Sequence, residues 1–169
     1  MEVSGETYWE VAPDKNRPFK INIAGKGKIE VLGTHFDVNA YDDEDAIRTT
    51  LLEGSLRVIR DGVGSLLSPG QQAVLANTTK DIKVVNDANI DEVMAWRNGR
   101  FIFSDMDLKT IMRQLTRWYD VDVVYEGKVP EIRVGGIIHN DVYLSTVMEF
   151  LGENGVHYKI EGKKITIMP

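Results

Sequence analysis

The stretch VLGTHFDVNAYDDED, residues 31–45, decides the fold of the first half of the chain. Its apolar residues Phe36, Val38 and Ala40 alternate with polar ones, which is the period of an extended strand with one buried face. The run just before it repeats this pattern at Ile29 and Val31. Both runs therefore predict strands that turn these five side chains toward a core.

Similar short runs, separated by turn residues, fill the chain as far as residue 85. The runs are ETYWEVA (6–12), FKINIA (19–24), KIEVL (28–32), THFDVNA (34–40), LLEGSLRVI (51–59) and IKVV (82–85), with breaks at PDKNRP, GKG, DGVG and PGQ. Strands of this length with Gly and Pro punctuation predict an all-β domain, either a sandwich or a solenoid. Gly33 and Gly54 lie among the strand-like runs, where glycine indicates a bulge, a bend or close backbone approach.

The periodicity changes from two to about 3.6 after Trp96, which predicts helices. Two apolar stripes have this spacing: Leu108, Ile111, Met112, Leu115 and Trp118, and then Leu144, Val147, Met148 and Leu151. We therefore expect a domain boundary between residues 87 and 96, with an all-β domain at 1–93 and an α+β domain at 94–169.

The second half also repeats itself at a shift of 36 residues. The shift superposes Gly99 on Gly135, Asp105 on Asp141, Leu108 on Leu144, Thr110 on Thr146, Met112 on Met148 and Leu115 on Leu151. Each copy has the order strand, helix, strand, so a duplicated βαβ unit with an extra final strand is expected. Asp105 and Asp141 are predicted to be the helix N-caps.

The composition excludes several classes of function. The chain has 169 residues, no cysteine and a net charge of -6, and residues 1–95 hold 10 Lys and Arg against 16 Asp and Glu. Without cysteine there is no disulfide or thiolate site. The acidic first half argues against nucleic-acid binding, which needs a basic surface. The opening residues lack the pattern of a signal peptide, and no apolar run is long enough to span a bilayer.

The acidic stretch itself offers two metal-site hypotheses. His35 and Asp37 share the polar side of their strand, but zinc needs three or four ligands and the other histidines, His139 and His157, lie far along the chain. The run 42–45 lacks the alternation of a calcium loop, so a solvated hairpin turn is favoured. No nucleophile motif or P-loop is present, and we expect no enzyme activity, no cofactor and no metal.

Several of these runs resemble one known family, the periplasmic part of FecR-type anti-sigma factors. The resemblance rests on GETYWEVAPDKNRPFKI, KIEVLGTHFDVNAY, LLEGSLRV with LLSPGQQA, WRNGRFIFSDMDLKTIMRQLTRWYDVDVVYE and VHYKIEGKKITI. It implies a FecR domain followed by a domain similar to the secretin and TonB short N-terminal domain.

The resemblance also implies a function. Such proteins are single-pass inner-membrane regulators that hold an extracytoplasmic-function sigma factor through a cytoplasmic segment. Their periplasmic part senses a TonB-dependent outer-membrane transporter through the transporter's N-terminal signalling domain. We therefore expect this chain to be a periplasmic fragment that binds that domain, and to contact no sigma factor, because the cytoplasmic segment is absent.

The expected binding mode is addition of a partner strand to an open sheet edge. Two edges are predicted, the strand with Arg133, Gly135 and Ile137, and the terminal strand with Lys164 and Thr166. The rings of Trp118 and Tyr119, at the end of the first helix, form either a partner-binding patch or a buried ring and a cap on the domain edge. The alternative function is an exported carbohydrate-binding or accessory β-module, which would present a row of exposed aromatics on the β-domain. Tyr8, Trp9 and Tyr41 are too few and too scattered to form such a row.

Overall fold

The computed structural model describes residues 1–14, 16–23 and 25–169. Positions 15 and 24 lie outside the described residues. Position 15 belongs to the predicted break at 13–18, and position 24 is the last residue of the predicted strand at 19–24. The chain is mostly β, with 51% strand and 16% helix, as predicted. Its contacts divide it into two compact units, Met1–Val93 and Met94–Pro169. No helix in the described ranges has the length and apolarity that a bilayer crossing requires.

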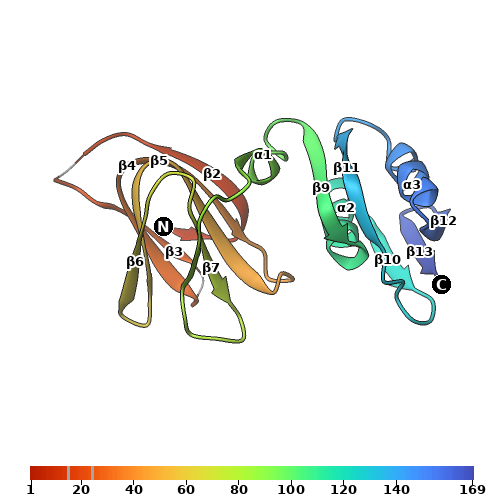
Figure 1. Cartoon of the computed structure of the whole chain (residues 1–169), viewed down its shortest axis with the longest axis horizontal. Coiled ribbons are helices and arrows are strands. Elements are labelled where there is room, and N and C mark those ends of the chain that lie inside the picture. The colour runs from red at the N-terminus through yellow and green to blue at the C-terminus, as the bar shows by residue number, and fades with distance from the viewer. Residues whose placement is uncertain (15, 24) are drawn as a thin grey trace. The chain divides into compact units, whose positions relative to one another are not determined.

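Unit 1, Met1–Val93, is an eight-stranded sheet followed by one short helix, shown from red to green in Figure 1. Its elements are β1 (Glu2–Val3), β2 (Gly5–Val11), β3 (Phe19–Ile23), β4 (Gly27–Ala40), β5 (Ala46–Arg60), β6 (Val63–Leu67), β7 (Gln72–Ala76), β8 (Lys83–Val85) and α1 (Ile90–Val93). The strands pair in the order β1-β3-β4-β5-β7-β8, while β2 also pairs with β4 and β6 with β5. The long strands β4 and β5 link all eight into one network, because the two halves of each pair with different neighbours, so the choice between a sandwich and a solenoid stays a prediction.

The long strand β4 combines two runs that the sequence predicted as separate strands. Ile29 and Val31 are buried in its first part, and Phe36, Val38 and Ala40 are buried in its second. Val31 and the next buried residue, Thr34, are three positions apart. In a regular strand this odd spacing would direct the buried side chains of the second part to the opposite face of the sheet. The register shift between Val31 and Thr34 inserts the bulge that keeps both parts facing one core.

The bulge explains Gly33 and Gly54, whose predicted close approach is confirmed. Gly54 has φ +88° and lies opposite Thr34 in the β4–β5 ladder. A Cβ atom on Gly54 would lie 2.4 Å from the carbonyl oxygen of Gly33, a distance that real Cβ atoms do not reach. Only glycine therefore allows the two long strands to approach where the sheet changes register.

Three strands, β1, β6 and β7, were not predicted from the sequence. The predicted break DGVG is partly wrong, because Val63 and Gly64 already belong to β6. The turn itself is Asp61-Gly62, with φ of 49° and 81°. Two consecutive positive φ values are those of the type I′ turn that joins tight hairpins, and Asp-Gly suits this turn.

Unit 2, Met94–Pro169, contains two small sheets and two helices (Figure 1). Its elements are β9 (Arg100–Asp107), α2 (Leu108–Tyr119), β10 (Asp122–Tyr125), β11 (Arg133–His139), α3 (Leu144–Glu153), β12 (His157–Glu161) and β13 (Lys164–Met168). The order strand, helix, strand occurs twice, as expected. However, β9 pairs with β11, whereas β10 and β12 both pair with β13. The strands flanking each helix are therefore not sheet neighbours, so neither copy is a βαβ unit with paired strands, and the duplication stays a prediction.

Most residues of the predicted helical stripes form the core of unit 2, whereas Trp118, the last residue of the first stripe, is 45% exposed. Leu108, Ile111, Met112 and Leu115 of α2 are buried with Val147, Met148 and Leu151 of α3. The helices thus pack their apolar faces into one cluster that includes Phe101 and Phe103 of β9.

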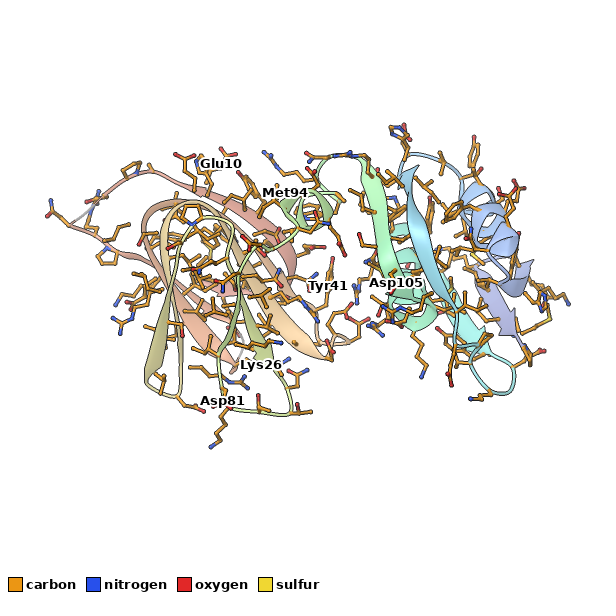
Figure 2. All side chains as sticks on the ribbon, in the orientation of Figure 1. Glu10, Lys26, Tyr41, Asp81, Met94 and Asp105 are labelled. Atoms are coloured by element: carbon orange, nitrogen blue, oxygen red, sulfur yellow. The ribbon has the colours of Figure 1, made fainter. Side chains whose placement is uncertain are left out.

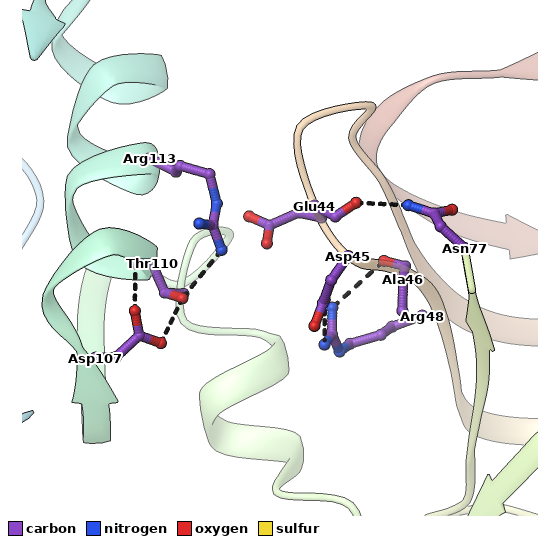
Figure 3. Close-up of polar contacts among 8 residues, drawn as sticks. All are labelled: Glu44, Asp45, Ala46, Arg48, Asn77, Asp107, Thr110 and Arg113. Carbon is purple, nitrogen blue, oxygen red and sulfur yellow. Dashed lines mark hydrogen bonds and ion pairs between the residues drawn. The ribbon is translucent and has the colours of Figure 1, made fainter. Parts of the chain in front are cut away.

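The predicted N-caps are wrong by two residues in both helices. Asp107 caps α2: its carboxylate accepts hydrogen bonds from the Thr110 N–H at 3.0 Å and the Thr110 hydroxyl at 2.7 Å (Figure 3). Tyr143 precedes α3 without a side-chain cap. Burial raises the pKa of Asp107, but the Thr110 hydrogen bonds and the charges of nearby arginines outweigh it and lower the pKa.

Candidate partner-binding site

Of the two predicted edges, only the strand that begins at Arg133 is an edge. In unit 2, β11 pairs with β9 in a two-stranded sheet, and no other strand of the described chain pairs with β11. An antiparallel strand with one neighbour directs about half of its backbone N–H and C=O groups away from that neighbour. The terminal strand β13 instead lies between β10 and β12, so the prediction that it is an edge is wrong.

The side chains of β11 alternate between the core and the outside. Val134 is buried and Ile138 packs against the core cluster of unit 2. Arg133, Gly135, Ile137 and His139 point the other way, and Ile137 is 63% exposed. Ile137 is thus an exposed aliphatic residue in the middle of an edge strand.

Gly136 brings β11 close to helix α3. A Cβ atom at this position would lie 2.7 Å from Cζ of Phe150. The ring of Phe150 in turn stacks on Phe103 of β9, with centroids 6.4 Å apart. The missing side chain therefore lets α3 pack closely against the inner face of the β9–β11 ribbon.

A bulge in β9 fixes the start of β11. Val134 lies opposite Met106 and Gly136 opposite Phe103, so two residues of β9, Ser104 and Asp105, face Gly135 alone. Asp105 has φ +51° and is labelled on β9 in Figure 2. The Arg133 guanidinium binds it twice, with Nε 2.8 Å from the carboxylate and Nη2 donating to the Asp105 carbonyl.

Asp105 lies in this bulge and not at the helix cap. Strand β9 continues to Asp107, and α2 begins two positions later than the spacing predicted. Bulges increase the local twist of a ribbon, so Asp105 and Arg133 together set the direction in which β11 presents its free edge.

Trp118 and Tyr119 hold the segment that follows β11. The Trp118 indole N–H donates to the Asn140 carbonyl at 2.8 Å, and the Tyr119 hydroxyl donates to the Val142 carbonyl at 2.8 Å. Both rings also contact Phe101, Trp118 edge-on at 5.7 Å. Burial, together with the nearby Asp141 carboxylate, raises the pKa of Tyr119, so the phenol remains a donor.

These contacts favour the interpretation of the two rings as structural anchors, although Trp118 stays 45% exposed. Each ring uses its polar atom to satisfy a loop carbonyl, and the apolar part packs on Phe101. The exposed side of Trp118 remains available at the carboxyl end of β11.

The two edges of the three-stranded sheet in unit 2, β10 and β12, are better protected than β11. The edge strand β12 carries the ion pair Lys159–Glu161, with 3.0 Å between Nζ and Oε1, and β10 is only four residues long. Between Arg133 and His139, β11 has the uncharged sequence VGGII. Charged side chains and short length block strand addition, so β11 is less protected than β10 and β12; β9, the other strand of its sheet, is also an edge.

The structure thus brings together some of the predicted partner-binding residues and separates others. Arg133, Gly135 and Ile137 share the outer face of β11, and Trp118 and Tyr119 bind the segment after it. Lys164 and Thr166 lie in the other sheet, and Thr166 is only 6% exposed. Asp105 was not among the predicted partner-binding residues, because its spacing had assigned it to a helix cap.

The acidic residues 42–45, considered above as a metal site, lie in the predicted hairpin turn between β4 and β5. Asp45 pairs with Arg48 at 3.1 Å, and the Asn77 side chain donates to the Glu44 carbonyl at 2.8 Å (Figure 3). His35 Nδ1 lies 3.2 Å from the Glu53 carboxylate. Among the described residues, no three His, Cys, Asp or Glu side chains cluster as a metal site would require.

The aromatics named for a carbohydrate surface do not form an exposed row. Trp9 packs against the core of unit 1, where its ring lies 5.8 Å from Phe19 and 6.4 Å from Phe36. Tyr8 and Tyr41 are half-buried. Sugar-binding modules need flat, exposed rings, so no observation on these residues favours this alternative.

Comparisons with known proteins agree with this architecture. The family model "FecR protein" matches residues 2–57, and the model "FecR, C-terminal" matches residues 100–167. No curated protein sequence matches the chain. The two family matches together take in most of the chain, so the chain belongs to the FecR family of anti-sigma factors. Membership of this family indicates a regulatory, non-enzymatic role.

Solved structures with the same fold include two crystal structures of a "putative anti-sigma factor" from Parabacteroides distasonis ATCC 8503, at 1.65 Å and 2.50 Å resolution. Both have a TM-score of 0.84 and 23% sequence identity with this chain. The alignments cover 98% and 99% of this chain and 78% of the other. At this identity the likeness establishes the fold.

Proposed function

We propose that this chain is the periplasmic sensor part of a transmembrane anti-sigma factor. It relays the state of a TonB-dependent outer-membrane transporter to an extracytoplasmic-function sigma factor by protein recognition. Membership of the FecR family supports the regulatory role. The observation that carries the binding mode is the open, uncharged edge of β11 with Ile137 exposed on it.

Recognition at this edge takes place by strand addition. The transporter's N-terminal signalling domain supplies one extended strand, whose backbone groups bond to the outward N–H and C=O groups of β11. Its side chains then pack beside Ile137, while the ion pair of Arg133 with Asp105 keeps the start of the edge in place. Backbone bonds give the affinity, and the side chains near Ile137 give the specificity.

The test is a calorimetric titration of the chain with purified N-terminal signalling domains, repeated with two matched variants. Ile137→Lys places a charge on the β11 edge. Val124→Lys places the same charge on β10, at a residue that is 42% exposed. We expect Ile137→Lys to weaken binding by a factor of about ten or more, which is about 1.4 kcal/mol, and Val124→Lys to leave it unchanged.

Circular dichroism of both variants establishes that neither substitution unfolds the chain. Loss of binding in Val124→Lys with full binding in Ile137→Lys would assign the contact to the other sheet and exclude the β11 edge.

A further inference from the structure

A second open edge lies in unit 1, at β6, and the proposed function does not use it. β6 pairs with β5 along its whole length, from Val63 opposite Arg60 to Leu67 opposite Leu56, and with no other strand in the described ranges. Its sequence, VGSLL, contains no charge, and Val63 and Leu66 are both 68% exposed. Edge strands normally carry charged residues, proline or bulges that prevent pairing with another chain.

The two faces of β6 differ in a way that matters for pairing. Ser65 and Leu67 lie opposite Val58 and Leu56, which are buried, so they belong to the core face. Gly64 and Leu66 lie on the outer face. The outer face therefore alternates between a position without a side chain and the most exposed leucine of the chain.

We propose that β6 binds β6 of a second copy of this chain, antiparallel and about a two-fold axis through Ser65. In this register all five residues pair across the axis. Val63 lies opposite Leu67 of the second copy, Gly64 opposite Leu66, and Ser65 opposite its own equivalent. The contact is isologous, so it closes after two copies and gives a dimer.

A second copy is the occupant because the edge is complementary to itself in size. Each Leu66 faces the bare Gly64 of the other copy, and from there it reaches Ile59, which lies beside Gly64 in β5. The Arg57 guanidinium now lies over Gly64, where a Cβ atom would be 2.5 Å from its Nε. Arg57 is exposed and flexible, so it can turn aside and stack on the incoming leucine.

Other registers lose this match. A shift by one residue would place the core face of one copy beside the outer face of the other, because opposed residues in a ladder point to the same side. A shift by two shortens the ladder and moves Leu66 away from Gly64.

The predicted dimer is weak. A single five-residue strand pair buries less area than standard interfaces, so we expect a dissociation constant of about 0.1–1 mM. This inference does not rest on the proposed function, because β6 and β11 belong to different units.

Disulfide trapping tests the register directly, since the natural chain has no cysteine. In the proposed dimer two Ser65→Cys side chains lie opposite each other, with Cβ atoms about 4.5–5.5 Å apart, close to disulfide geometry. Two Leu66→Cys side chains lie on a diagonal, about 7–8 Å apart, which is too far. Under mild oxidation we expect Ser65→Cys to form covalent dimers several-fold faster than Leu66→Cys, even though Leu66 is the more exposed residue.

Sedimentation of the whole chain tests the association without cysteine. The natural chain should show concentration-dependent dimerisation up to about 1 mM. Leu66→Lys should abolish it, because the charge lies at the pairing edge. Leu32→Lys, at a 45% exposed residue of β4, should dimerise normally. A strictly monomeric natural chain, equal trapping of the two cysteine variants, or normal dimerisation of Leu66→Lys would overturn the proposal.

Discussion

The close approach of β4 and β5 in unit 1 depends on Gly54, and the free energy of unfolding of a Gly54→Ala variant tests this dependence. The Cβ atom of alanine would meet the Gly33 carbonyl oxygen at 2.4 Å and the Thr34 Cα at 3.1 Å. Both are backbone atoms of β4, so the contact is relieved only by separating the two strands. Alanine at φ +88° adds a conformational cost of about 1–2 kcal/mol, and overpacking adds about 1–3 kcal/mol.

We therefore expect Gly54→Ala to lower the free energy of unfolding of unit 1 by about 2–5 kcal/mol, a large share of the about 5–15 kcal/mol that stabilises a typical domain. Gly62→Ala is the matched control. Gly62 has φ +81°, but a Cβ atom there would meet nothing within 4 Å. The control should lose only the conformational cost, about 1–2 kcal/mol.

The assay is urea unfolding followed by the methyl NMR signals of Leu51 and Leu56, which are buried in the core of unit 1. These signals report unit 1 alone, which matters because a chain of two units need not unfold in one step. If Gly54→Ala costs no more than Gly62→Ala, the close approach of the two strands does not shape the sheet.

Three further predictions concern unit 2. Asp107→Ala should lower the free energy of unfolding by about 1 kcal/mol at pH 7. The fold lowers the pKa of Asp107 from its ordinary value of 3.8, so this contribution is present above pH 3.8 and disappears as the pH falls through the pKa of the folded state. Urea unfolding should therefore show the stabilities of wild type and variant converging in acid. Trp118→Phe removes the hydrogen bond to Asn140 and should cost about 1 kcal/mol, with faster amide hydrogen exchange in residues 140–142. Gly136→Val should clash with Phe150 and cost about 1–3 kcal/mol, measured as a lower melting temperature.

Local patterns predicted the parts of the fold that depend on neighbours in sequence. The alternation at Phe36, Val38 and Ala40 identified buried side chains, because a strand exposes every second residue to the same side. The helical spacing of Leu108 and Ile111 identified the core face of α2, because residues three or four positions apart lie on the same side of a helix.

Pairings between distant strands were not predictable in this way. The terminal strand with Thr166 has a neighbour on each side, and one of them, β10, pairs with it across about forty residues of chain. Periodicity assigns a strand its faces but not its neighbours, so the edge predicted there was wrong. The bulge at Asp105 was missed for a similar reason, because it depends on the pairing with β11.

Open edges were also hard to recognise from sequence. β6 was missed because Val63 and Leu66 are apolar yet exposed, which breaks the alternation that predicts a half-buried strand. The same exposure makes β6 and β11 candidates for contacts with other chains. Residues that contradict a local pattern are often those that serve binding.

The proposed binding of a transporter's signalling domain to the β11 edge is tested by calorimetric titration of the natural chain and its Ile137→Lys and Val124→Lys variants. We expect saturable binding by the natural chain and by Val124→Lys, and an affinity that is lower by a factor of about ten or more in Ile137→Lys. Unchanged affinity in a folded Ile137→Lys variant would contradict the proposal.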